Sequence, residues 1–400
     1  MLEKLHLWSL PEPLVEISKH KDMDKELSYW TVFVHVPQVK TKKKNEIVVR
    51  LFEQGNSIID FFHLELSDWK NDFGLTDSET QLFKETYSEL SNYAFMVEDL
   101  LEQGYSILPI TSKEYSPTLK KNLGRSFSPP VLYTKGNLNL MKQKSIAIVG
   151  SRKSNDSSLI FTDNVAKKAS NEFKVVVSGF AKGVDQQALE SALRHNGQSI
   201  IVLPQGISTF NSGFKNYYRQ IIEGDVLVLS TFYPKSPWSV QFAMARNPII
   251  YGLASEIYVA ESSAKGGTWS GVMDGLRKGR TIYVRKPNPR EKNANELLIS
   301  KGAKAVDEMG DFIEYVMSEN PNSMVSEPET HSSGTESKII DLLRRGAFDS
   351  KSIVEKLGIN WSARKVTSYL KKQDEVETIN SKPLKFIHRD RLESHQTTLF

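Results

Sequence analysis

Short apolar segments rich in β-branched residues, separated by stretches long enough for helices, constrain the fold of this chain most strongly. Strands that alternate with helix-length spacers are typical of βαβ units, in which helices cover both faces of a parallel sheet. Right-handed connections then give an open, Rossmann-like parallel sheet of the α/β class, with ligands at the carboxyl ends of the strands. The predicted strands are Ser145–Val149, Lys174–Val177, Ser199–Leu203, Val226–Leu229, Glu256–Val259 and Thr281–Val284.

The region before this α/β core reads differently. Residues 1–105 contain a basic segment, Lys40–Lys44, which we expect to be a loop, and two helical patterns. One pattern, Thr76–Leu90, begins with an N-capping box, and the other is Tyr93–Gln103. We predict an N-terminal, mainly helical domain here, and the α/β domain over residues 106–317.

A linker and a small basic module follow the α/β domain. Residues 318–335 are rich in Ser, Glu, Pro, Asn and Thr, which is a linker composition. Residues 336–391 predict two helices, a glycine turn, a third helix and a hairpin, which is the outline of a winged helix-turn-helix. They hold 13 Lys and Arg residues against 8 Asp and Glu residues, so this module carries essentially all of the net charge of +4.

The third predicted helix of this module, Trp361–Lys372, occupies the position of a recognition helix. Its concentrated charge favours contact with DNA, and the alternative is a protein-interaction module with a solvated basic face. The basic residues of this helix are Arg364, Lys365, Lys371 and Lys372.

Composition narrows the class of protein. The chain has no cysteine, which removes disulfides and thiolate chemistry, and its 8 histidines lack metal-ligand spacing, so we expect neither a metal nor a cofactor. The N-terminus lacks a signal-peptide pattern, and no apolar run is long enough to span a membrane. We therefore expect a soluble cytoplasmic protein with no membrane contact.

The loop after the first predicted strand carries Gly150, Ser151, Arg152 and Lys153, and a helix begins near Asn155. The N-terminus of a helix binds phosphate readily because its backbone N–H groups lack partners within the helix. The alternative is a surface turn with solvated charges.

The loop after the second strand has the same character, since Ser178 and Gly179 precede Lys182 and Gly183. Carboxyl ends of parallel strands meet at one edge of a sheet, so we expect the cations of these two loops to converge.

Two further segments supply cations to the same edge. Arg246 and Asn247 stand just before an apolar helix, and Lys265 precedes Gly266 and Gly267, whose N–H groups can form an anion-binding nest. A row of cations with few acids among them suits a polyanion better than a small metabolite.

Taken in order, these motifs resemble the DNA-processing protein A (DprA/Smf) family. The resemblance covers roughly residues 105–306, and its motifs are individually weak but occur at family-like spacing. They are Pro129–Asn137, Val149–Arg152, Ser178–Asp185, Arg246-Asn247, Glu261 followed by Gly266–Thr268, and Asn295–Ala303.

The resemblance implies a Rossmann-like domain that binds single-stranded DNA, forms a homodimer and hands the strand to a RecA-type recombinase, without catalysis. By motif position, Arg152, Lys182 and Lys265 would contact phosphates. The chain departs from the family at Leu189, where a histidine is usual, and at Pro248, where a second arginine is usual. These departures indicate a divergent branch.

Two other functions stay open. Glu261, beside Gly266 and Gly267, could be the catalytic carboxylate of a Rossmann-like enzyme that binds or cleaves nucleotides, although no paired acid and base accompany it. Divergent members of the family can also act as an antitoxin-like regulatory partner of a toxin in a phage-defence module.

Overall fold

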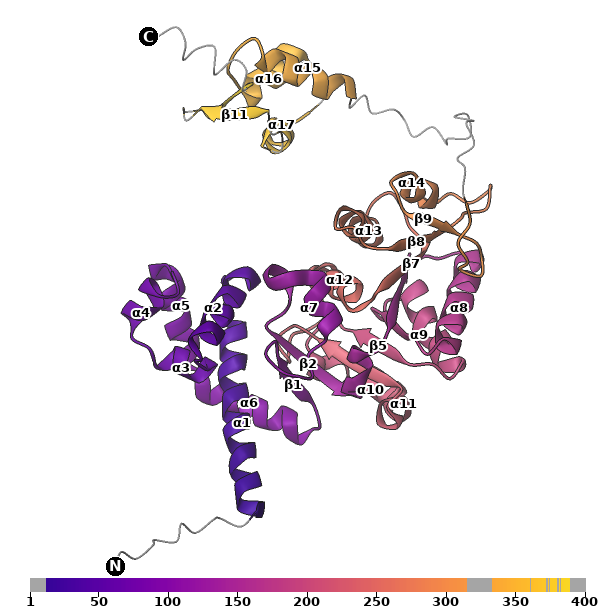
Figure 1. Cartoon of the computed structure of the whole chain (residues 1–400). Coiled ribbons are helices and arrows are strands. Elements are labelled where there is room, and N and C mark those ends of the chain that lie inside the picture. The colour runs from indigo at the N-terminus through magenta and orange to yellow at the C-terminus, as the bar shows by residue number, and fades with distance from the viewer. Residues whose placement is uncertain are drawn as a thin grey trace, which may run out of the picture. The chain divides into compact units, whose positions relative to one another are not determined.

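The computed structural model describes residues 12–314, 333–359, 361–371, 373, 375–379, 381 and 383–388. The chain forms two compact units, residues 1–317 and 318–400, which are described separately below (Figure 1). No helix among the described residues is long and apolar enough to cross a membrane.

The first unit is built on a nine-stranded sheet in the order β1-β2-β6-β5-β4-β3-β7-β8-β9. All seven strands from β6 to β9 in this order are parallel, which confirms the predicted α/β class and every predicted strand. The pairs β1–β2 and β2–β6 are antiparallel, so the sheet has a mixed edge that the sequence did not predict. The strands are β1 (Ser106–Pro109), β2 (Val131–Gly136), β3 (Ser145–Gly150), β4 (Val175–Ser178), β5 (Ser199–Val202), β6 (Val226–Ser230), β7 (Glu256–Glu261), β8 (Ile282–Arg285) and β9 (Lys304–Val306).

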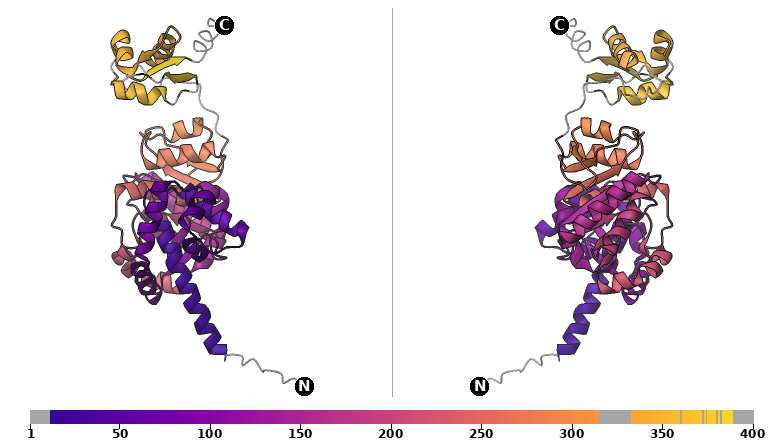
Figure 2. Two further views of the ribbon diagram at one scale, coloured as in Figure 1. Left: turned by 90° about the vertical axis from the view of Figure 1, so that its left-hand side faces the viewer. Right: turned by 90° about the vertical axis from the view of Figure 1, so that its right-hand side faces the viewer.

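Helices cover both faces of this sheet because side chains alternate along each strand. Ile146 and Ile148 of β3 pack on α8 (Asp156–Asn171) and α9 (Val184–Arg194), the pair seen from outside in Figure 2 (right). Ala147 and Val149 point to the opposite face, where they share a core with α7 and α12. The helices of this second face are α7 (Pro117–Phe127), α12 (Val240–Leu253), α13 (Gly267–Arg277) and α14 (Asn295–Ser300).

The N-terminal helices enclose an aromatic core. Phe61 contacts Phe33, Trp69 and Phe83, with ring centroids 5.2 to 5.8 Å apart. This core continues into side chains of β1, β2, β5 and β6, so the boundary predicted at residue 105 does not separate two compact units. The helices are α1 (Glu12–His35), α2 (Thr41–Gln54), α3 (Ile58–His63), α4 (Leu66–Asn71), α5 (Asp77–Ser88) and α6 (Leu90–Glu102).

Two local predictions in this region had different outcomes. The capping box is confirmed, since the Thr76 hydroxyl accepts from the Glu79 N–H and the Glu79 carboxylate accepts from the Thr76 N–H. The expected loop Lys40–Lys44 is wrong, because α2 begins at Thr41. Its buried face, which includes Ile47 and Leu51, stabilises the helix against the charge of its first turn.

The second unit packs three helices with a small antiparallel sheet in the order β10-β12-β11. Its core includes Ile353, Val366 and Leu370. The three helices and the hairpin follow the predicted order, β10 between the first two helices was not predicted, and the winged helix-turn-helix stays a prediction. They are α15 (Ser333–Leu343), β10 (Phe348–Asp349), α16 (Ser350–Leu357), α17 (Ala363–Leu370), β11 (Val376–Ile379) and β12 (Lys385–His388). Most of the predicted linker lies outside the described residues.

Candidate functional site

A pocket of about 370 Å³ opens at the carboxyl ends of β3, β4 and β7, which are neighbours in the sheet. We call it the strand-end pocket. It brings together segments that are far apart in the sequence, as expected for an edge where parallel strands end. Its lining comes from the loop after β3 (Val149–Arg152), the segment after β4 (Ala181 and Asp185), one face of α12 (Val240, Ala243, Met244, Arg246, Asn247, Ile250 and Tyr251) and the segment after β7 (Ser263 and Lys265–Thr268).

The loops around the pocket hold one another by backbone contacts. Gly183 has φ +83°, and a Cβ there would lie 2.5 Å from the Ser151 carbonyl oxygen, so only glycine allows this approach. The Val184 N–H donates to the same oxygen at 3.3 Å. On the other side, the Thr268 hydroxyl donates to the Gly150 carbonyl at 3.1 Å. The three loops therefore converge, as the sequence predicted.

Arg246 forms the floor of the pocket. It is 3% exposed, its Nη2 donates to the Gly179 carbonyl at 2.7 Å, and the same atom lies 3.6 Å from Asp185 Oδ2. A Cβ at Gly179 would overlap the guanidinium, so a larger residue there would displace Arg246 from this position. Burial raises the pKa of the Asp185 carboxyl and lowers that of the Arg246 guanidinium, and the attraction between them opposes both shifts. The charge of Arg246 is thus largely neutralised within the fold.

The predicted position of Arg246 and Asn247 in front of an apolar helix is wrong, because both lie inside α12. Pro248 lies inside the helix, although proline lacks an N–H and disfavours a helical conformation at the preceding residue. Packing overrides this preference: Ile249 and Ile250 are buried against the sheet, and the helix continues.

The rim of the pocket carries exposed cations. Arg152 and Lys265 line it, and Lys182 is exposed next to Ala181, which also lines it. Lys153 is exposed on the loop after β3. None of these four side chains has a hydrogen bond or ion pair within the described part of the chain. They are therefore available to an anion from solution.

The N-termini of the three helices at this edge differ. At α8, the Asn155 side chain accepts from the Ser158 N–H, and Glu261 Oε2 accepts from the Asn155 N–H at 3.2 Å and from the Ser158 hydroxyl at 2.9 Å. These contacts occupy the N-terminus that the sequence analysis expected to be free. At α9, Asp185 stands in the first turn.

Helix α13 offers the open N-terminus. It begins after Gly266, no side chain caps it within the described structure, and its first turn contains no acid. Gly266, Gly267 and Thr268 line the pocket beside Lys265. The partial positive charge of a helix N-terminus and a neighbouring lysine favour an anion at this point.

The other predicted residues, Ser151, Ser178 and Asn247, contact the backbone of the loops or the residues next to it. The Ser151 hydroxyl bonds with the backbone of Lys153, and the Ser178 hydroxyl donates to the Asp185 carbonyl at 2.9 Å. Asn247 lies so close to Gly267 that a Cβ there would be 2.8 Å from the amide nitrogen.

The sequence prediction included Arg246 and Asn247 of α12 but not the other residues of this helix that form one wall of the pocket. Val240, Met244, Asn247 and Tyr251 recur at the spacing of one helix face, and this periodicity was the available signal. It also missed Asp185 as the partner of Arg246. Leu189, the departure from the family pattern, is fully buried in the core that joins the N-terminal helices to the sheet.

The C-terminal candidates belong to the second unit. Arg364 and Lys365 are exposed on α17, and the Lys365 ammonium lies 4.1 Å from the centre of the Trp361 ring. Lys371 is exposed at the end of that helix, and Lys372 lies outside the described residues. Within the described residues, no group of three or more His, Asp or Glu side chains is placed to hold a metal ion.

Comparison with known proteins gives a consistent result. The family model for DNA recombination-mediator protein A matches residues 106–317. The DNA processing protein DprA of Streptococcus pneumoniae is 34% identical over 158 residues, which are 39% of this chain and 55% of that protein. DprA of Bacillus subtilis is 28% identical over 224 residues, which are 55% of this chain and 74% of that protein. The match thus spans about half of the first relative and three quarters of the second.

The fold is also similar to that of a solved structure. The X-ray structure of DNA processing protein A from Streptococcus pneumoniae superposes with a TM-score of 0.60 at 24% identity. The superposition covers 72% of this chain and 99% of that chain.

Proposed function

The chain belongs to the family of DNA recombination-mediator protein A, and from this premise we propose that it binds single-stranded DNA at the strand-end pocket, without catalysis. The observation that carries the proposal is the rim: Arg152 and Lys265 line one pocket beside the open N-terminus of α13, and both are exposed without an ion-pair partner in the described structure. Lys182 does not line the pocket, but it is exposed next to Ala181, which does. Point charges and backbone N–H groups recognise phosphates and read little of the base sequence.

The size of the pocket favours a single strand over a duplex. A cavity of about 370 Å³ is at the lower end of the range for small-molecule sites, so it accommodates a phosphate with its nucleotide. A base-paired duplex is too wide to enter, whereas an unpaired strand can place successive phosphates along the rim. The binding is therefore expected to be weakly dependent on sequence and strongly dependent on salt.

Further parts of the proposal follow from the family. We place the protein in the cytoplasm, as a homodimer that delivers the bound strand to a RecA-type recombinase. We assign the second unit to DNA contact through Arg364, Lys365 and Lys371, which are exposed on or next to α17. The enzyme alternative needed Glu261 as a free carboxylate, but Glu261 caps α8, which supports a binding role for the pocket.

Binding of labelled oligo-dT by the full chain, compared with a duplex of the same length, tests this function. Wild type should prefer the single strand, and Arg152→Glu or Lys182→Glu should weaken that binding strongly, because each places a negative charge on the rim. Unchanged affinity in both variants would contradict the proposal. Nucleotide turnover that is lost in Glu261→Gln would instead favour an enzyme.

A further inference from the structure

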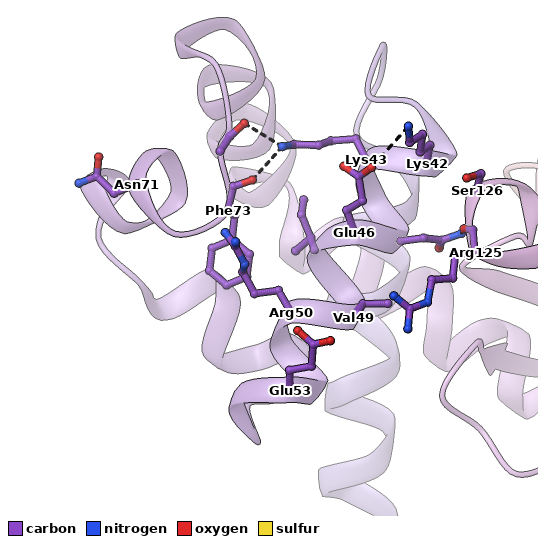
Figure 3. Close-up of a pocket in the computed structure, with 13 residues that line it drawn as sticks. Lys42, Lys43, Glu46, Val49, Arg50, Glu53, Asn71, Phe73, Arg125 and Ser126 are labelled. Atoms are coloured by element: carbon purple, nitrogen blue, oxygen red, sulfur yellow. Dashed lines mark hydrogen bonds and ion pairs between the residues drawn. The ribbon is translucent and has the colours of Figure 1, made fainter.

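A second and larger cavity, of about 620 Å³, lies between α2, the segment that joins α4 to α5, and the last turn of α7 (Figure 3). We call it the α2–α7 pocket. Its charged lining side chains are Lys42, Lys43, Glu46, Arg50, Glu53 and Arg125.

Two of these cations are already engaged. The Lys43 ammonium donates to the carbonyls of Phe73 and Gly74 at 2.8 and 2.7 Å. Lys42 lies 3.9 Å from the Glu46 carboxylate in an exposed pair, which contributes little to stability. Arg50 and Arg125 have no hydrogen bond or ion pair from their guanidinium groups within the described part of the chain.

Arg50 and Arg125 approach the cavity from different walls. Figure 3 shows Arg125 extending from α7 toward α2, and Arg50 extending from α2 toward Phe73. The backbone at Arg125 is held in place by Asn45, which is 3% exposed and whose Nδ2 donates to the carbonyls of Arg125 and Ser128. A buried side chain thus fixes the segment that presents the second guanidinium.

The start of α2 adds to the positive potential of this cavity. Its first turn contains Lys42, Lys43 and Lys44 and no acid, and no side chain caps it. Cations at a helix N-terminus oppose the helix dipole, so this arrangement costs stability unless an anion lies nearby. Lys44 does not face the cavity as a free cation, because its ammonium donates to the carbonyls of Val34 and Val36 at the end of α1.

Helix α7 connects this cavity to the strand-end pocket. It packs against both α2 and α12, and Figure 1 shows it between them. A hollow of about 150 Å³ lies between α7, α12 and α13, and it shares Met244, Asn247 and Gly267 with the strand-end pocket. Lys278 lines this hollow and lies 5.2 Å from the centre of the Phe127 ring, two residues beyond Arg125. Lys278 is itself paired with Asp274, 2.7 Å away, so what lies between the two pockets is helix α7 and this hollow.

We propose that the α2–α7 pocket is a second phosphate site, in which Arg50 and Arg125 contact the same DNA strand after it leaves the strand-end pocket and passes over α7. The inference rests on the proposed function and extends it from one pocket to a path across the N-terminal helices. A strand is favoured over an acidic peptide because two unpaired guanidinium groups match phosphate oxygens in geometry. The connection to the strand-end pocket through α7 points the same way.

The test compares oligo-dT of about 6 nucleotides, near the lower end of single-strand site sizes, with one of about 30 nucleotides. The double variant Arg50→Ala, Arg125→Ala should bind the short strand as wild type does, because that strand fills the strand-end pocket alone. It should bind the long strand roughly a hundredfold more weakly, since two charged hydrogen bonds are lost and each costs about tenfold. The log–log salt slope for the long strand should become shallower by about 1.4, or about 0.7 per contact.

Two controls keep the outcome clear. Arg219→Ala removes an exposed arginine that lines neither pocket, and it should leave both affinities unchanged. Glu53→Gln removes a carboxylate from the α2–α7 pocket and should strengthen binding of the long strand alone. These exposed substitutions are expected to leave the unfolding temperature near that of wild type, which thermal melting checks.

The results separate this inference from the proposed function. If Arg152→Glu abolishes binding of both strands while the double variant binds both as wild type does, the second site is refuted and the first stands. If the wild-type protein binds neither the short nor the long oligo-dT in a salt-dependent way, the proposed function itself fails. Loss of an acidic protein partner in the double variant, with DNA binding unchanged, would also overturn the inference.

Discussion

The floor and the rim of the strand-end pocket contain the same kind of residue in opposite roles. On the floor, Arg246 is buried against Asp185 and the Gly179 carbonyl, so its charge is used within the fold. On the rim, Arg152 and Lys265 are exposed and have no partner in the described structure. Within one pocket, burial and pairing therefore decide whether a basic residue stabilises the protein or remains available to a ligand.

The largest expected effect is on the free energy of unfolding, and it should occur when a residue of the pocket floor is changed. Arg246→Ala should lower the free energy of unfolding by about 3–5 kcal/mol, because it leaves the Asp185 carboxylate buried without its counter-charge. Chemical denaturation measures the change. Adding Asp185→Asn should recover part of the loss, and a double-variant loss equal to the sum of the losses in Arg246→Ala and Asp185→Asn would show that the pair is not coupled.

His35 is a partly buried titratable group, and like Arg246 on the floor of the pocket it should affect stability. His35 packs on Tyr133 and its Nε2 lies 2.8 Å from the Tyr133 hydroxyl; burial and the nearby Lys44 ammonium lower its pKa from 6.5 to about 3. The unfolded chain then binds a proton that the folded protein does not, so stability is full above pH 6.5 and falls as pH drops toward 3. Between the two pKa values the slope approaches about 1.4 kcal/mol per pH unit, which corresponds to one proton.

Denaturation at several values between pH 7 and 5 measures this dependence. In His35→Phe the slope of unfolding free energy against pH should be smaller over this range, by the amount that corresponds to about one bound proton. An identical slope in the variant would assign the pH dependence to other groups.

Substitution of a rim residue should change the affinity for oligo-dT and leave the free energy of unfolding nearly unchanged. Lys265→Ala should weaken binding of oligo-dT by roughly tenfold, since it removes one charge-assisted phosphate contact beside the N-terminus of α13. Its unfolding free energy should stay within about 0.5 kcal/mol of wild type. Lys167→Ala, an exposed lysine on α8 outside this pocket, is the matched control. A similar loss in both variants would mean that net charge, and not the rim, governs affinity.

The smallest expected effect concerns the acid next to the rim. Glu261→Gln keeps an oxygen that can accept from Asn155 and Ser158 while removing a negative charge. Binding of oligo-dT should strengthen by roughly two- to threefold, which is the scale of one screened surface charge. Weaker binding in this variant would place Glu261 in direct contact with the ligand.

Much of the fold followed from the sequence because the strands of the parallel sheet are continuous β-branched runs, such as Val175–Val177, flanked by glycine-containing loops. The convergence of Gly150, Ala181 and Gly266 on one pocket followed from topology alone, since parallel strands that are adjacent end at one edge. Such features depend on local pattern and on general rules of chain connection.

The features that escaped prediction depend on contacts between distant residues. Glu261 caps α8 from 106 positions away, and no local pattern indicates that contact. Arg246 reads as an exposed cation until α12 is seen to place it under Gly179. Arg246 and Asn247 lie within α12 and not before it, because the buried residues on both sides of Pro248 keep the helix continuous. Short strands β1 and β2 carried too little pattern to be distinguished from loops.

The central claim is that exposed rim cations hold the phosphates of a DNA strand, and the salt dependence of oligo-dT binding tests it most directly. Wild type and the double variant Arg152→Ala, Lys265→Ala should be titrated at several salt concentrations, and the log–log slope of the variant should be shallower by about 1.4, or 0.7 for each lost contact. A variant slope equal to that of wild type would contradict the account.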